Sequence, residues 1–465
     1  MLFRFAFLTP ATNTRTDRYG GSFENRLRFL LDIVRVMRAE LGPRRLLSTR
    51  LNGDDLLPGG LGTEEYCDVA RVLAAHGVDI LHVSAGTYRV MERRIPPMYL
   101  QNEGFAKYAG VLRRACGLPV IASGTIHDMS EANRLIADLE ADLIALARPL
   151  FADPDLPNKI VEGRADDVLP CIACNTCLGR EQGGRRGFCA VNPATGHEHE
   201  VHPSSRSPRT VGIVGAGPAG MQMALTAAAR GHRVTLWEKH DRVGGLLRVA
   251  AMLPFKSTLP RLLRYYETAL ARAGVKLRLG AQVDPATLAD DLMVLATGAQ
   301  WRIPPKTAER TAIPMLTPED IVVDIDGVGP RVLVVGGGLI GAEVAWRLSA
   351  AGRSVCLVER DDSFDEDINL IARTVLEQEL ARNNVEIVFR GNVEDVTGST
   401  AWITEQGSRR GREFDAVVWT ARRNDPVGDA IAKAGRPNVI VIGERSGARG
   451  LLLATSSAYR AAVGL

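Results

Sequence analysis

The chain contains the same strand–turn–helix pattern twice, and each copy carries three spaced glycines. The first copy, TVGIVGAGPAGMQMALTAAARGHRVTLWEK, runs from an apolar segment through the turn into an Ala-rich helix and a second apolar segment. Gly215 makes the tight turn, Gly217 lets the backbone approach a pyrophosphate, and Gly220 permits close helix–strand packing. The amino end of the helix presents unpaired N–H groups to phosphates. Glu238 follows about twenty residues later, where it can accept hydrogen bonds from ribose hydroxyls. The pattern predicts an α/β dinucleotide-binding fold.

The second copy, RVLVVGGGLIGAEVAWRLSAAGRSVCLVER, carries Gly336, Gly338 and Gly341 and ends its second apolar segment at Glu359. Two copies predict two dinucleotides, or one dinucleotide and a second site that holds an inert ADP moiety. Glu359 favours NADH, because a carboxylate repels the 2′-phosphate of NADPH. The adjacent Arg360 would attract that phosphate, so the choice between NADH and NADPH stays open.

Four of the seven cysteines form the pattern C-x2-C-x2-C-x11-C, at Cys171, Cys174, Cys177 and Cys189. Three thiolates in one short stretch can surround one face of an iron–sulfur cube, and a fourth can close it. A structural zinc site usually takes two separated C-x2-C pairs, which this spacing fits less well. The pattern predicts a [4Fe-4S] cluster, with zinc or with free or disulfide-bonded thiols as the alternatives. The other cysteines lie in helical or strand patterns and are predicted to be ordinary buried thiols: Cys67, Cys116 and Cys356.

Composition sets the broad class of protein. A chain of 465 residues is too long for one core and predicts about three domains. The net charge of +3 gives no reason to expect a nucleic-acid or anionic-membrane partner. The clustered cysteines indicate a reducing compartment. The apolar opening MLFRFAFLTP lacks a signal-peptide cleavage site, and no apolar run reaches the ~20 residues of a membrane span, so a cytoplasmic location is expected.

Residues 1–165 alternate strand and helix signals. The runs RLLSTRL, VDILHVSAG, LPVIASGTI and ADLIALARPL are typical of strands, and they end at or near Arg50, Gly86, Gly124 and Arg148. Amphipathic helical patterns such as ENRLRFLLDIVRVMRAEL lie between them. Four β/α units in a row predict a parallel barrel or a piece of one.

The two glycine copies and the motifs around them resemble the two-dinucleotide flavoproteins that share the fold of glutathione reductase. The supporting motifs are the Gly-Gly pair ending at Gly245, the strand end Thr297-Gly298, and the run VIVIGE near the C-terminus. The resemblance implies that the first copy binds FAD and that the second, inserted copy binds NAD(P)H. The family ends its last FAD motif in Gly-Asp, whereas this chain has Gly443-Glu444. The longer side chain of Glu444 implies a weaker or shifted contact with the FAD ribityl–pyrophosphate region.

The strings TNTRTDRYGGSFENRLRF, GTIHD and ALARPLFADPDLPNK closely resemble the long-form old yellow enzyme class. That class joins an FMN barrel to a [4Fe-4S] cluster and an FAD/NAD(P) module, and includes trimethylamine dehydrogenase and 2,4-dienoyl-CoA reductase. The cysteine spacing is closer to the amine dehydrogenase branch, whereas the intact second glycine motif is closer to the reductase branch. The resemblance covers essentially the whole chain.

The resemblance also assigns FMN-binding residues. It places Arg50 beside the N1/O2 edge of the flavin, and Gly124 and Arg148 at the FMN phosphate. Barrel phosphate sites are commonly built by the loops after the last two strands, which agrees with this assignment. The alternatives are a surface ion pair for Arg50 and, for Arg148, a salt bridge to the loop that contains Asp153 and Asp155.

The family barrel has eight strands, and this sequence contains signals for the last four. The family's catalytic His or Tyr motif lies upstream of them, so no catalytic residue is assigned. Four parallel strands leave two open edges and an unfilled interior. We therefore expect a truncated product, a mis-assigned start, or a chain that needs either a missing N-terminal half-barrel or a homo-oligomer. His82 is predicted to be packed in a strand, and His127 follows the phosphate loop without a firm role.

The predicted fold class is α/β with four parts. Residues 1–165 form the C-terminal half of a TIM barrel, strands 5–8, which is the FMN-binding half. Residues 166–208 form the [4Fe-4S] loop and a linker. Residues 209–300 and 415–465 form a Rossmann-like FAD-binding domain, and residues 301–414 form the inserted NAD(P)-binding domain.

Three functions remain open at this point, each with a small-molecule substrate. The first passes electrons from NAD(P)H through FAD and the cluster to FMN, which reduces an activated C=C bond. The second runs the same relay in the oxidative direction, as an amine dehydrogenase or demethylase. The third is an FAD/NADH diaphorase fragment without substrate chemistry.

Overall fold

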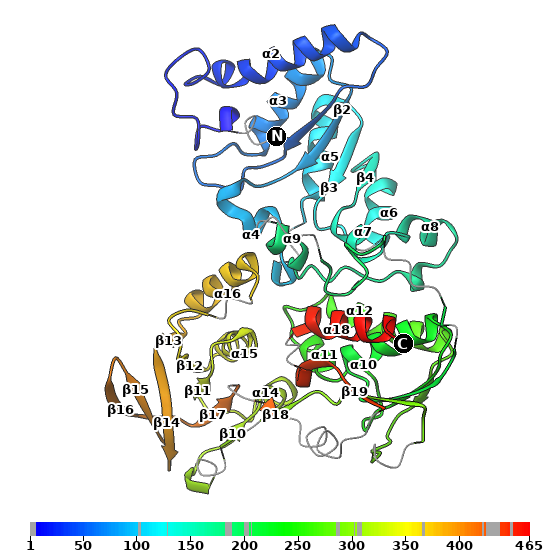
Figure 1. Ribbon diagram of the computed structural model, residues 1–465. Helices are drawn as coiled ribbons and strands as arrows, with labels where there is room; N and C mark the ends of the chain where they lie inside the picture. The colour runs from blue at the N-terminus through cyan, green and yellow to red at the C-terminus, as the bar shows by residue number, and fades with distance from the viewer. Residues whose placement is uncertain are drawn as a thin grey trace. The chain divides into compact units, whose positions relative to one another are not determined.

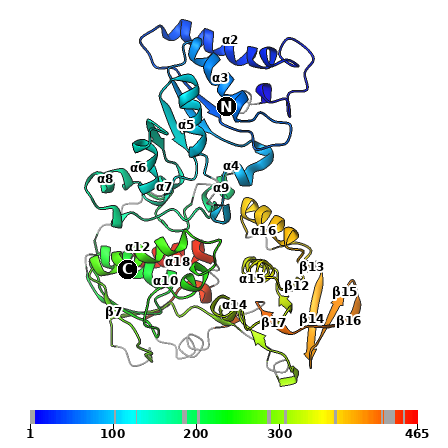
Figure 2. The ribbon, with the colours of Figure 1, turned by 180° about the vertical axis from the view of Figure 1, so that it is seen from behind.

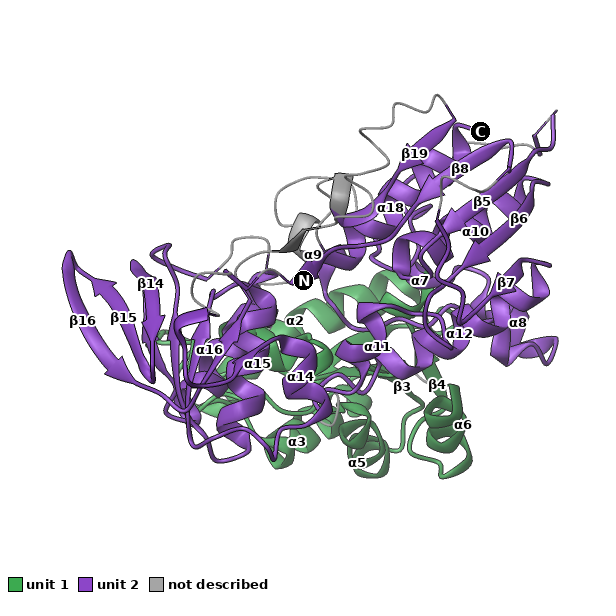
Figure 3. Ribbon diagram, turned by 90° about the horizontal axis from the view of Figure 1, so that it is seen from below, with its two compact units in different colours: residues 1–150 green, residues 151–465 purple. Residues whose placement is uncertain are grey.

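The computed structural model describes residues 6–100, 104–127, 129–181, 188–199, 204–205, 207–284, 289–301, 303–304, 309–364, 368–420, 423–424, 438–446 and 450–465. It forms two compact units, residues 1–150 and 151–465 (Figure 3). No helix in these ranges combines the length and hydropathy that a bilayer crossing requires.

The first unit is built on a parallel sheet in the order β1-β2-β3-β4, as the four β/α signals predict (Figure 1). Its strands are β1 Ser48–Asn52, β2 Ile80–Ser84, β3 Val120–Ser123 and β4 Leu143–Ala145, and its longer helices are α2 Phe23–Leu41, α3 Thr63–Ala75, α5 Ala106–Cys116 and α6 Met129–Ala137. β1 and β4 are the edges of this sheet. Strand β1 runs two residues past Arg50, and Arg148 begins the helix α7 Arg148–Ala152 rather than ending a strand.

Successive side chains of a strand point to opposite faces, and the two faces of this sheet carry different residues. One face carries apolar side chains such as Leu51, Leu81 and Val120, each at most 1% exposed, which belong to the core formed with the helices. The other face carries the register partners Arg50 and His82, which are only partly buried. Because parallel strands normally bury both faces, this second face is the side that a closed barrel would fill.

The second unit contains two parallel sheets of the same design. The first sheet has the order β19-β8-β5-β6-β7, and the second has the order β10-β17-β11-β12-β13. In each, the strand before the glycine turn is central, followed by the strand that ends at the acidic residue. The strands of the first sheet are β5 Thr210–Val214, β6 Arg233–Trp237, β7 Lys276–Arg278, β8 Leu292–Leu295 and β19 Val439–Val441. Those of the second are β10 Met315–Leu316, β11 Arg331–Val335, β12 Ser354–Val358, β13 Glu386–Val388 and β17 Ala416–Trp419.

Helices cover these two sheets, and a separate small antiparallel sheet contacts the second one. Helix α18 Gly450–Val463 packs beside α10 Pro218–Ala229, with α11 Leu246–Ala251 and α12 Leu259–Arg272 nearby (Figure 1). The second sheet carries α14 Pro318–Val323, α15 Leu339–Ala350 and α16 Leu370–Arg382. Strands β14 Gly391–Thr397, β15 Thr400–Glu405 and β16 Ser408–Glu413 form the antiparallel sheet.

The boundary between the two nucleotide-binding parts differs from the sequence prediction. Strand β17 lies in the second sheet, although the predicted return to the FAD domain at residue 415 would place it in the first. The apolar run of β17 resembles a buried strand of either sheet, so its partner cannot be read from its own residues. The short strands β9 Gln300–Trp301 and β18 Arg423–Asn424 pair with each other on the two connections between the sheets.

The segment between α11 and α12 contacts α15, which belongs to the second sheet. Phe255 stacks on Trp346 with ring centroids 4.0 Å apart and an interplanar angle of 6°. Lys256 Nζ lies 2.6 Å from Glu343 Oε2, and these side chains are 9% and 3% exposed. The two nucleotide-binding parts are therefore joined by a buried ion pair beside an aromatic stack.

We expect Lys256→Met to destabilise the protein by about 3–5 kcal/mol, because the carboxylate of Glu343 is left buried without its cation. The double variant Lys256→Met, Glu343→Leu should recover most of this loss, since both charges are then absent. The measurement is the urea midpoint followed by tryptophan fluorescence. Arg310→Met, which removes an exposed ion pair to Asp395, is the control and should shift the midpoint far less. Equal midpoints for the single and double variants would contradict the expectation.

Candidate functional site

The first glycine turn is shaped by close backbone contacts on one side and open space on the other. Gly215 has φ +100°, in the left-handed region. A Cβ on Gly220 would lie 1.9 Å from the carbonyl oxygen of Gly215, so only glycine lets α10 approach β5 this closely. A Cβ on Gly217 would meet nothing within 4 Å. Gly217 precedes α10, and the open space is therefore at the amino end of this helix, where phosphates are favoured.

Residues far apart in the chain converge on this turn. The N–H of Gly244 donates to Ala216 O at 2.7 Å, and a Cβ on Gly245 would lie 3.1 Å from Gly217 Cα. A Cβ on Gly443 would lie 3.1 Å from the Cβ of Ala219, in the first turn of α10. This brings the Gly-Gly and the Gly443-Glu444 motifs of the sequence analysis to one place.

The strand β8 ends at the same turn. A Cβ on Gly215 would lie 2.4 Å from Ala296 O and 3.1 Å from Thr297 Cα. Gly298 follows with φ +67°, which favours glycine there. Glu444 lies in the 3-10 turn Gly443–Ser446. The end of β8, the Gly-Gly pair and Gly443 thus all border the first glycine turn.

Glu238 is anchored to the turn rather than exposed. Its side chain is 7% exposed, and its Oε2 accepts from the N–H of Ala216 at 2.9 Å. Its Oε1 lies 2.7 Å from His240 Nδ1 and accepts from the His240 N–H at 3.1 Å. The sequence analysis missed His240, although a histidine two residues after the acidic residue was a readable signal.

The second glycine turn repeats this arrangement, and each of its functional residues lies 121 positions after its counterpart. Gly336 has φ +105°, and a Cβ on Gly341 would lie 1.8 Å from Gly336 O. Gly338 caps α15. Glu359 is buried and accepts from the N–H groups of Gly337 and Asp361. The geometry of a dinucleotide turn is therefore complete in both copies.

Arg360 does not share the position of Glu359. Its side chain is 78% exposed, and its Nε lies 3.9 Å from Asp361 Oδ2. The buried carboxylate of Glu359 is thus the group held at the turn, whereas the guanidinium of Arg360 points to solvent beside another carboxylate. This favours a ribose with free hydroxyls over one that carries a 2′-phosphate.

The cysteine motif begins as an irregular loop. Ala173 and Asn175 both have left-handed backbones, with φ +53° and +57°. The N–H of Ala173 donates to Cys171 Sγ at 3.4 Å, and the Thr176 hydroxyl donates to Cys174 Sγ at 3.2 Å. Cys177 lies in the helix α9 Thr176–Glu181. Hydrogen bonds to sulfur of this kind are typical of thiolate clusters.

Cys189 follows the other three cysteines along the chain, beyond residues 182–187. Burial raises the pKa of its thiol to about 11, against backbone hydrogen bonds from Val191 and Asn192 that lower it. None of the seven cysteines, all of which lie in described ranges, forms a disulfide. Within those ranges no three His, Cys, Asp or Glu side chains are already arranged as a metal shell. The thiol donors and their amide partners fit an iron–sulfur cluster chemically, but their sulfurs are not gathered around one centre.

In the first unit, Arg50 and His82 are neighbours on the face opposite the helix-covered one. Burial lowers the pKa of Arg50, and the charge of Arg94 adds to this effect. Burial and then the charge of Arg50 lower the pKa of His82. His82 Nε2 is buried with no hydrogen-bond partner among the described residues. His82 was predicted to be packed in a strand, and it lies in β2, partly buried beside Arg50.

The expected FMN-phosphate residues lie at the carboxyl ends of β3 and β4. Gly124 has φ +91°, and a Cβ there would lie 2.5 Å from Phe105 Cδ2. Arg148 Nη1 donates to Pro96 O at 2.8 Å. Asp153, one alternative partner considered for Arg148, has Lys159 Nζ 2.7 Å from its Oδ2. His127 is buried.

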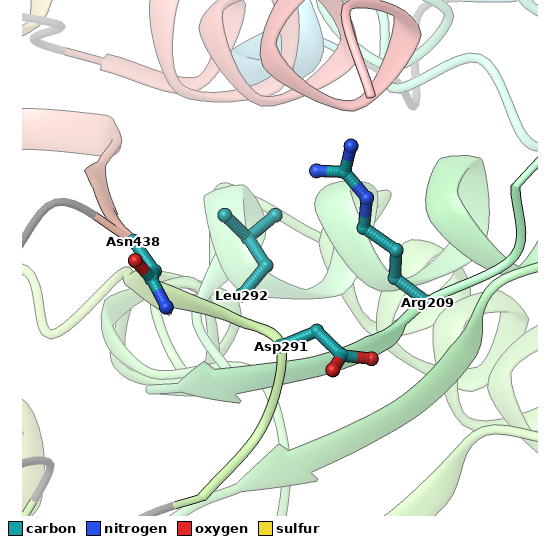
Figure 4. Close-up of a pocket in the computed structure, with 4 residues that line it drawn as sticks. All are labelled: Arg209, Asp291, Leu292 and Asn438. Atoms are coloured by element: carbon teal, nitrogen blue, oxygen red, sulfur yellow. The ribbon is translucent and has the colours of Figure 1, made fainter.

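A cavity of about 460 Å³ lies elsewhere in the second unit (Figure 4). It is lined by Arg209, Asp291, Leu292 and Asn438, next to the amino ends of β5, β8 and β19. Ligands of open α/β sheets bind outside the carboxyl ends of the strands, at the opposite edge. This cavity is therefore separate from the nucleotide turns.

Comparisons with known proteins match both units. Residues 4–167 match the model of the NADH:flavin oxidoreductase / NADH oxidase family, and residues 209–435 match that of the pyridine nucleotide-disulphide oxidoreductases. An NADH oxidase of Thermoanaerobacter brockii is 34% identical over 472 residues, covering 98% of this chain and 72% of that protein. The matches to three other curated relatives, a cinnamate reductase of Clostridium sporogenes, an N,N-dimethylglycine/sarcosine dehydrogenase of Chromohalobacter salexigens and a bilirubin reductase of Mediterraneibacter gnavus, span only 44% to 63% of the length of those proteins.

Two solved structures are similar along nearly the whole chain. A 2-naphthoyl-CoA reductase in complex with 2-naphthoyl-CoA has a TM-score of 0.90 and 28% identity, covering 99% of this chain and 72% of that one. A histamine dehydrogenase from Rhizobium sp. 4-9 has a TM-score of 0.88 and 26% identity, with the same coverage of 99% and 72%.

We expect Gly217→Ala to fold and to lose FAD, because its Cβ would enter the open space kept for the pyrophosphate. Gly220→Ala should instead fail to accumulate as folded protein, since its Cβ would overlap Gly215 O. The measurements are circular dichroism of the flavin-free chain and flavin absorbance after FAD titration. A Gly217→Ala chain that binds FAD as tightly as wild type would contradict this reading of the turn.

Proposed function

The chain belongs to the NADH:flavin oxidoreductase / NADH oxidase family with a pyridine nucleotide-disulphide oxidoreductase module, and we propose that it passes electrons from NADH to a flavin that reduces an activated C=C bond. The observation that carries this proposal is the pair of complete dinucleotide turns, each followed along the chain by an acidic residue at the same spacing. The four-cysteine motif precedes both turns in the sequence. The similarity to a 2-naphthoyl-CoA reductase supports a conjugated thioester or enoate as the substrate class.

At the entry end of the proposed relay, the turn Gly336–Gly341 would hold the pyrophosphate of NADH and Glu359 its adenosine ribose. Gly215, Gly217 and Gly220 would hold the FAD pyrophosphate. Glu238, kept in place by His240, would accept from the FAD ribose. The other proposed FAD contacts are Gly245, Thr297, Gly298, Gly443 and Glu444.

Cys171, Cys174, Cys177 and Cys189 would hold a [4Fe-4S] cluster, which supplies one-electron transfer. The residues of the loop would hold the four sulfurs and exclude water from them. Both Ala173 and Asn175 are at most 1% exposed. The chemistry of the donor set and its amide hydrogen bonds support the cluster over zinc.

FMN is proposed for the first unit, with Arg50 at the flavin edge and Gly124 and Arg148 at its phosphate. The edges β1 and β4 and the partly buried face with Arg50 and His82 support the proposal that further β/α units complete this site. Either an N-terminal half-barrel or a second copy of the chain would serve. Light scattering of the purified chain, together with its FMN content, separates these two.

The second candidate function is the oxidation of an amine, with electrons passed on to an external acceptor. The tight C-x2-C-x2-C spacing and the similarity to a histamine dehydrogenase favour it. Assays of NADH with an enoyl thioester, and of amines with an artificial acceptor, separate the two directions. Reduction of dyes by NADH without either substrate activity, and without bound FMN, would indicate the diaphorase fragment and overturn both.

We expect Glu359→Ser to raise the KM for NADH about tenfold or more, because a charge-assisted hydrogen bond to the ribose contributes about 1.5–3 kcal/mol. The turnover number at saturation should change little, since the ribose contact is the same in ground and transition states. The measurement is dye reduction with NADH and with NADPH. Arg360→Met is the matched control and should leave the KM for NADH unchanged. A large loss of NADPH use in Arg360→Met would favour NADPH as the natural donor.

Anaerobic reconstitution with iron and sulfide should load about four iron and four sulfide per chain and give a broad visible absorption. Cys174→Ser should lower the iron content and bleach this absorption, because it removes a thiolate from the centre of the motif. Cys116→Ser, which removes a thiol outside the motif, is the control and should load normally. If Cys174→Ser loads as well as wild type, the cluster assignment is wrong.

A further inference from the structure

Three side chains from distant elements donate hydrogen bonds to backbone carbonyls of the cysteine segment. Thr258 Oγ1 donates to Ile172 O at 3.0 Å. Asn369 Nδ2 donates to Asn175 O at 3.0 Å. Thr455 Oγ1 lies 2.9 Å from Ala190 O.

The accepting carbonyls share a position in the motif. Ile172 follows Cys171, Asn175 follows Cys174, and Ala190 follows Cys189, so each bond holds the residue directly after a cysteine. All three acceptor residues are at most 3% exposed. A buried carbonyl needs a donor, and a loop with left-handed residues has no regular ladder to provide one. Asn175 O also accepts from the N–H of Leu178 at 3.0 Å, whereas the described donors to Ile172 O and Ala190 O come from outside the loop.

Two of the donors, Thr258 and Asn369, occupy the N-cap positions of α12 and α16. Thr258 occupies the N-cap position of α12, yet its side chain makes no capping hydrogen bond and is turned to Ile172 O instead. It is 5% exposed. Threonine at this position usually accepts from the helix backbone. The contact with the cysteine loop has replaced that local bond.

Asn369 uses both ends of its amide. Its Oδ1 accepts from the N–H groups of Ile371 and Ala372, which caps α16, and its Nδ2 remains for Asn175. Helix α16 belongs to the second nucleotide-binding part, and α9 lies close to it in both views (Figures 1 and 2). The cysteine loop is thus held from the FAD side by Thr258 and from the NAD(P) side by Asn369.

The hydroxyl of Thr455, the third donor, has other carbonyl oxygens within hydrogen-bond distance besides Ala190 O. The Thr455 hydroxyl, fully buried on α18, also lies 3.1 Å from Leu451 O and 3.1 Å from Leu452 O. A hydroxyl has one proton, and the shortest of these contacts is the one to Ala190 O. Thr455 therefore ranks behind Thr258 and Asn369 as a test residue.

We propose that Thr258 and Asn369, with Thr455 as a third contact, are positioning residues that preorganise the cysteine loop for its cluster and fix it between the two nucleotide-binding parts. This rests on the proposed cluster. The three donors touch no cysteine sulfur in any described hydrogen bond and act through the backbone that sets the directions of the thiols. Removing one of them should loosen the loop without altering the donor set.

The test is the rate of iron loss from the reconstituted full chain to a chelator. Thr258→Val keeps the shape of the side chain and removes the hydroxyl. Thr258→Ser keeps the hydroxyl and removes the methyl group. Asn369→Ser and Asn369→Asp keep a capping oxygen and remove the amide donor; the serine variant separates the lost donor from the added charge. Thr374→Val is the matched control, because the described hydrogen bond of its hydroxyl is to Leu370 O, within α16.

We expect iron loss to be about three- to tenfold faster in Thr258→Val, Asn369→Ser and Asn369→Asp, as one buried hydrogen bond would give. Thr258→Ser and Thr374→Val should match wild type, and FAD content should be equal throughout. In the cluster-free chain, hydrogen exchange of residues 170–178 should be faster in the same variants. This second readout reports the loop itself rather than activity.

Wild-type rates in Thr258→Val and Asn369→Ser would overturn the proposal. So would equal loss in Thr374→Val, or loss of FAD together with iron, since either would show general destabilisation. If wild type itself takes up no cluster, the proposed function fails and the positioning role fails with it. If wild type loads and the variants load and hold iron equally well, only the positioning role is wrong.

Discussion

The close approach of a helix to a strand at Gly220, repeated at Gly341, is the constraint on which the second unit depends. A Cβ at these positions would lie 1.9 Å from Gly215 O and 1.8 Å from Gly336 O, so only glycine lets each helix begin this close to the preceding turn. This places the amino ends of α10 and α15 at the carboxyl edges of their sheets. The Gly-Gly segment, the end of β8 and Gly443 can then border the first turn, and the acidic residues can reach the backbone N–H groups of both turns.

The link between the two nucleotide-binding parts is polar as well as apolar. Lys256 and Glu343 would each be costly to bury alone, and their pairing beside the stack of Phe255 on Trp346 makes the junction specific. The same segment continues into Thr258, which contacts the cysteine loop. One short connection therefore contacts the second nucleotide-binding part and the cysteine loop, which ties the position of this loop to the packing of both parts.

Much of the site could be predicted because its residues have strong local meaning. Glycines at Gly215 and Gly336 need positive φ, and an acidic residue at the end of the next strand follows from the length of one βαβ unit. The predicted boundary at residue 415 placed β17 in the wrong sheet, because the residues of an apolar strand do not show which sheet it joins. His82 lies in a strand as expected, but a single strand cannot show that its neighbour in register is Arg50. His240 was missed, although its place two residues after Glu238 was a readable signal.

The sequence by itself determined the two dinucleotide turns, the four β/α units of the first part and the cysteine spacing, because each rests on short-range geometry or on repeated hydrophobic pattern. Only the tertiary structure decided which distant groups complete them. Thr258, Asn369 and Thr455 lie 86, 194 and 265 positions from the carbonyls that they contact. Hydrogen bonds over such separations depend on how helices pack, and single threonines and asparagines at helix starts are ordinary capping residues until the fold shows where their side chains point.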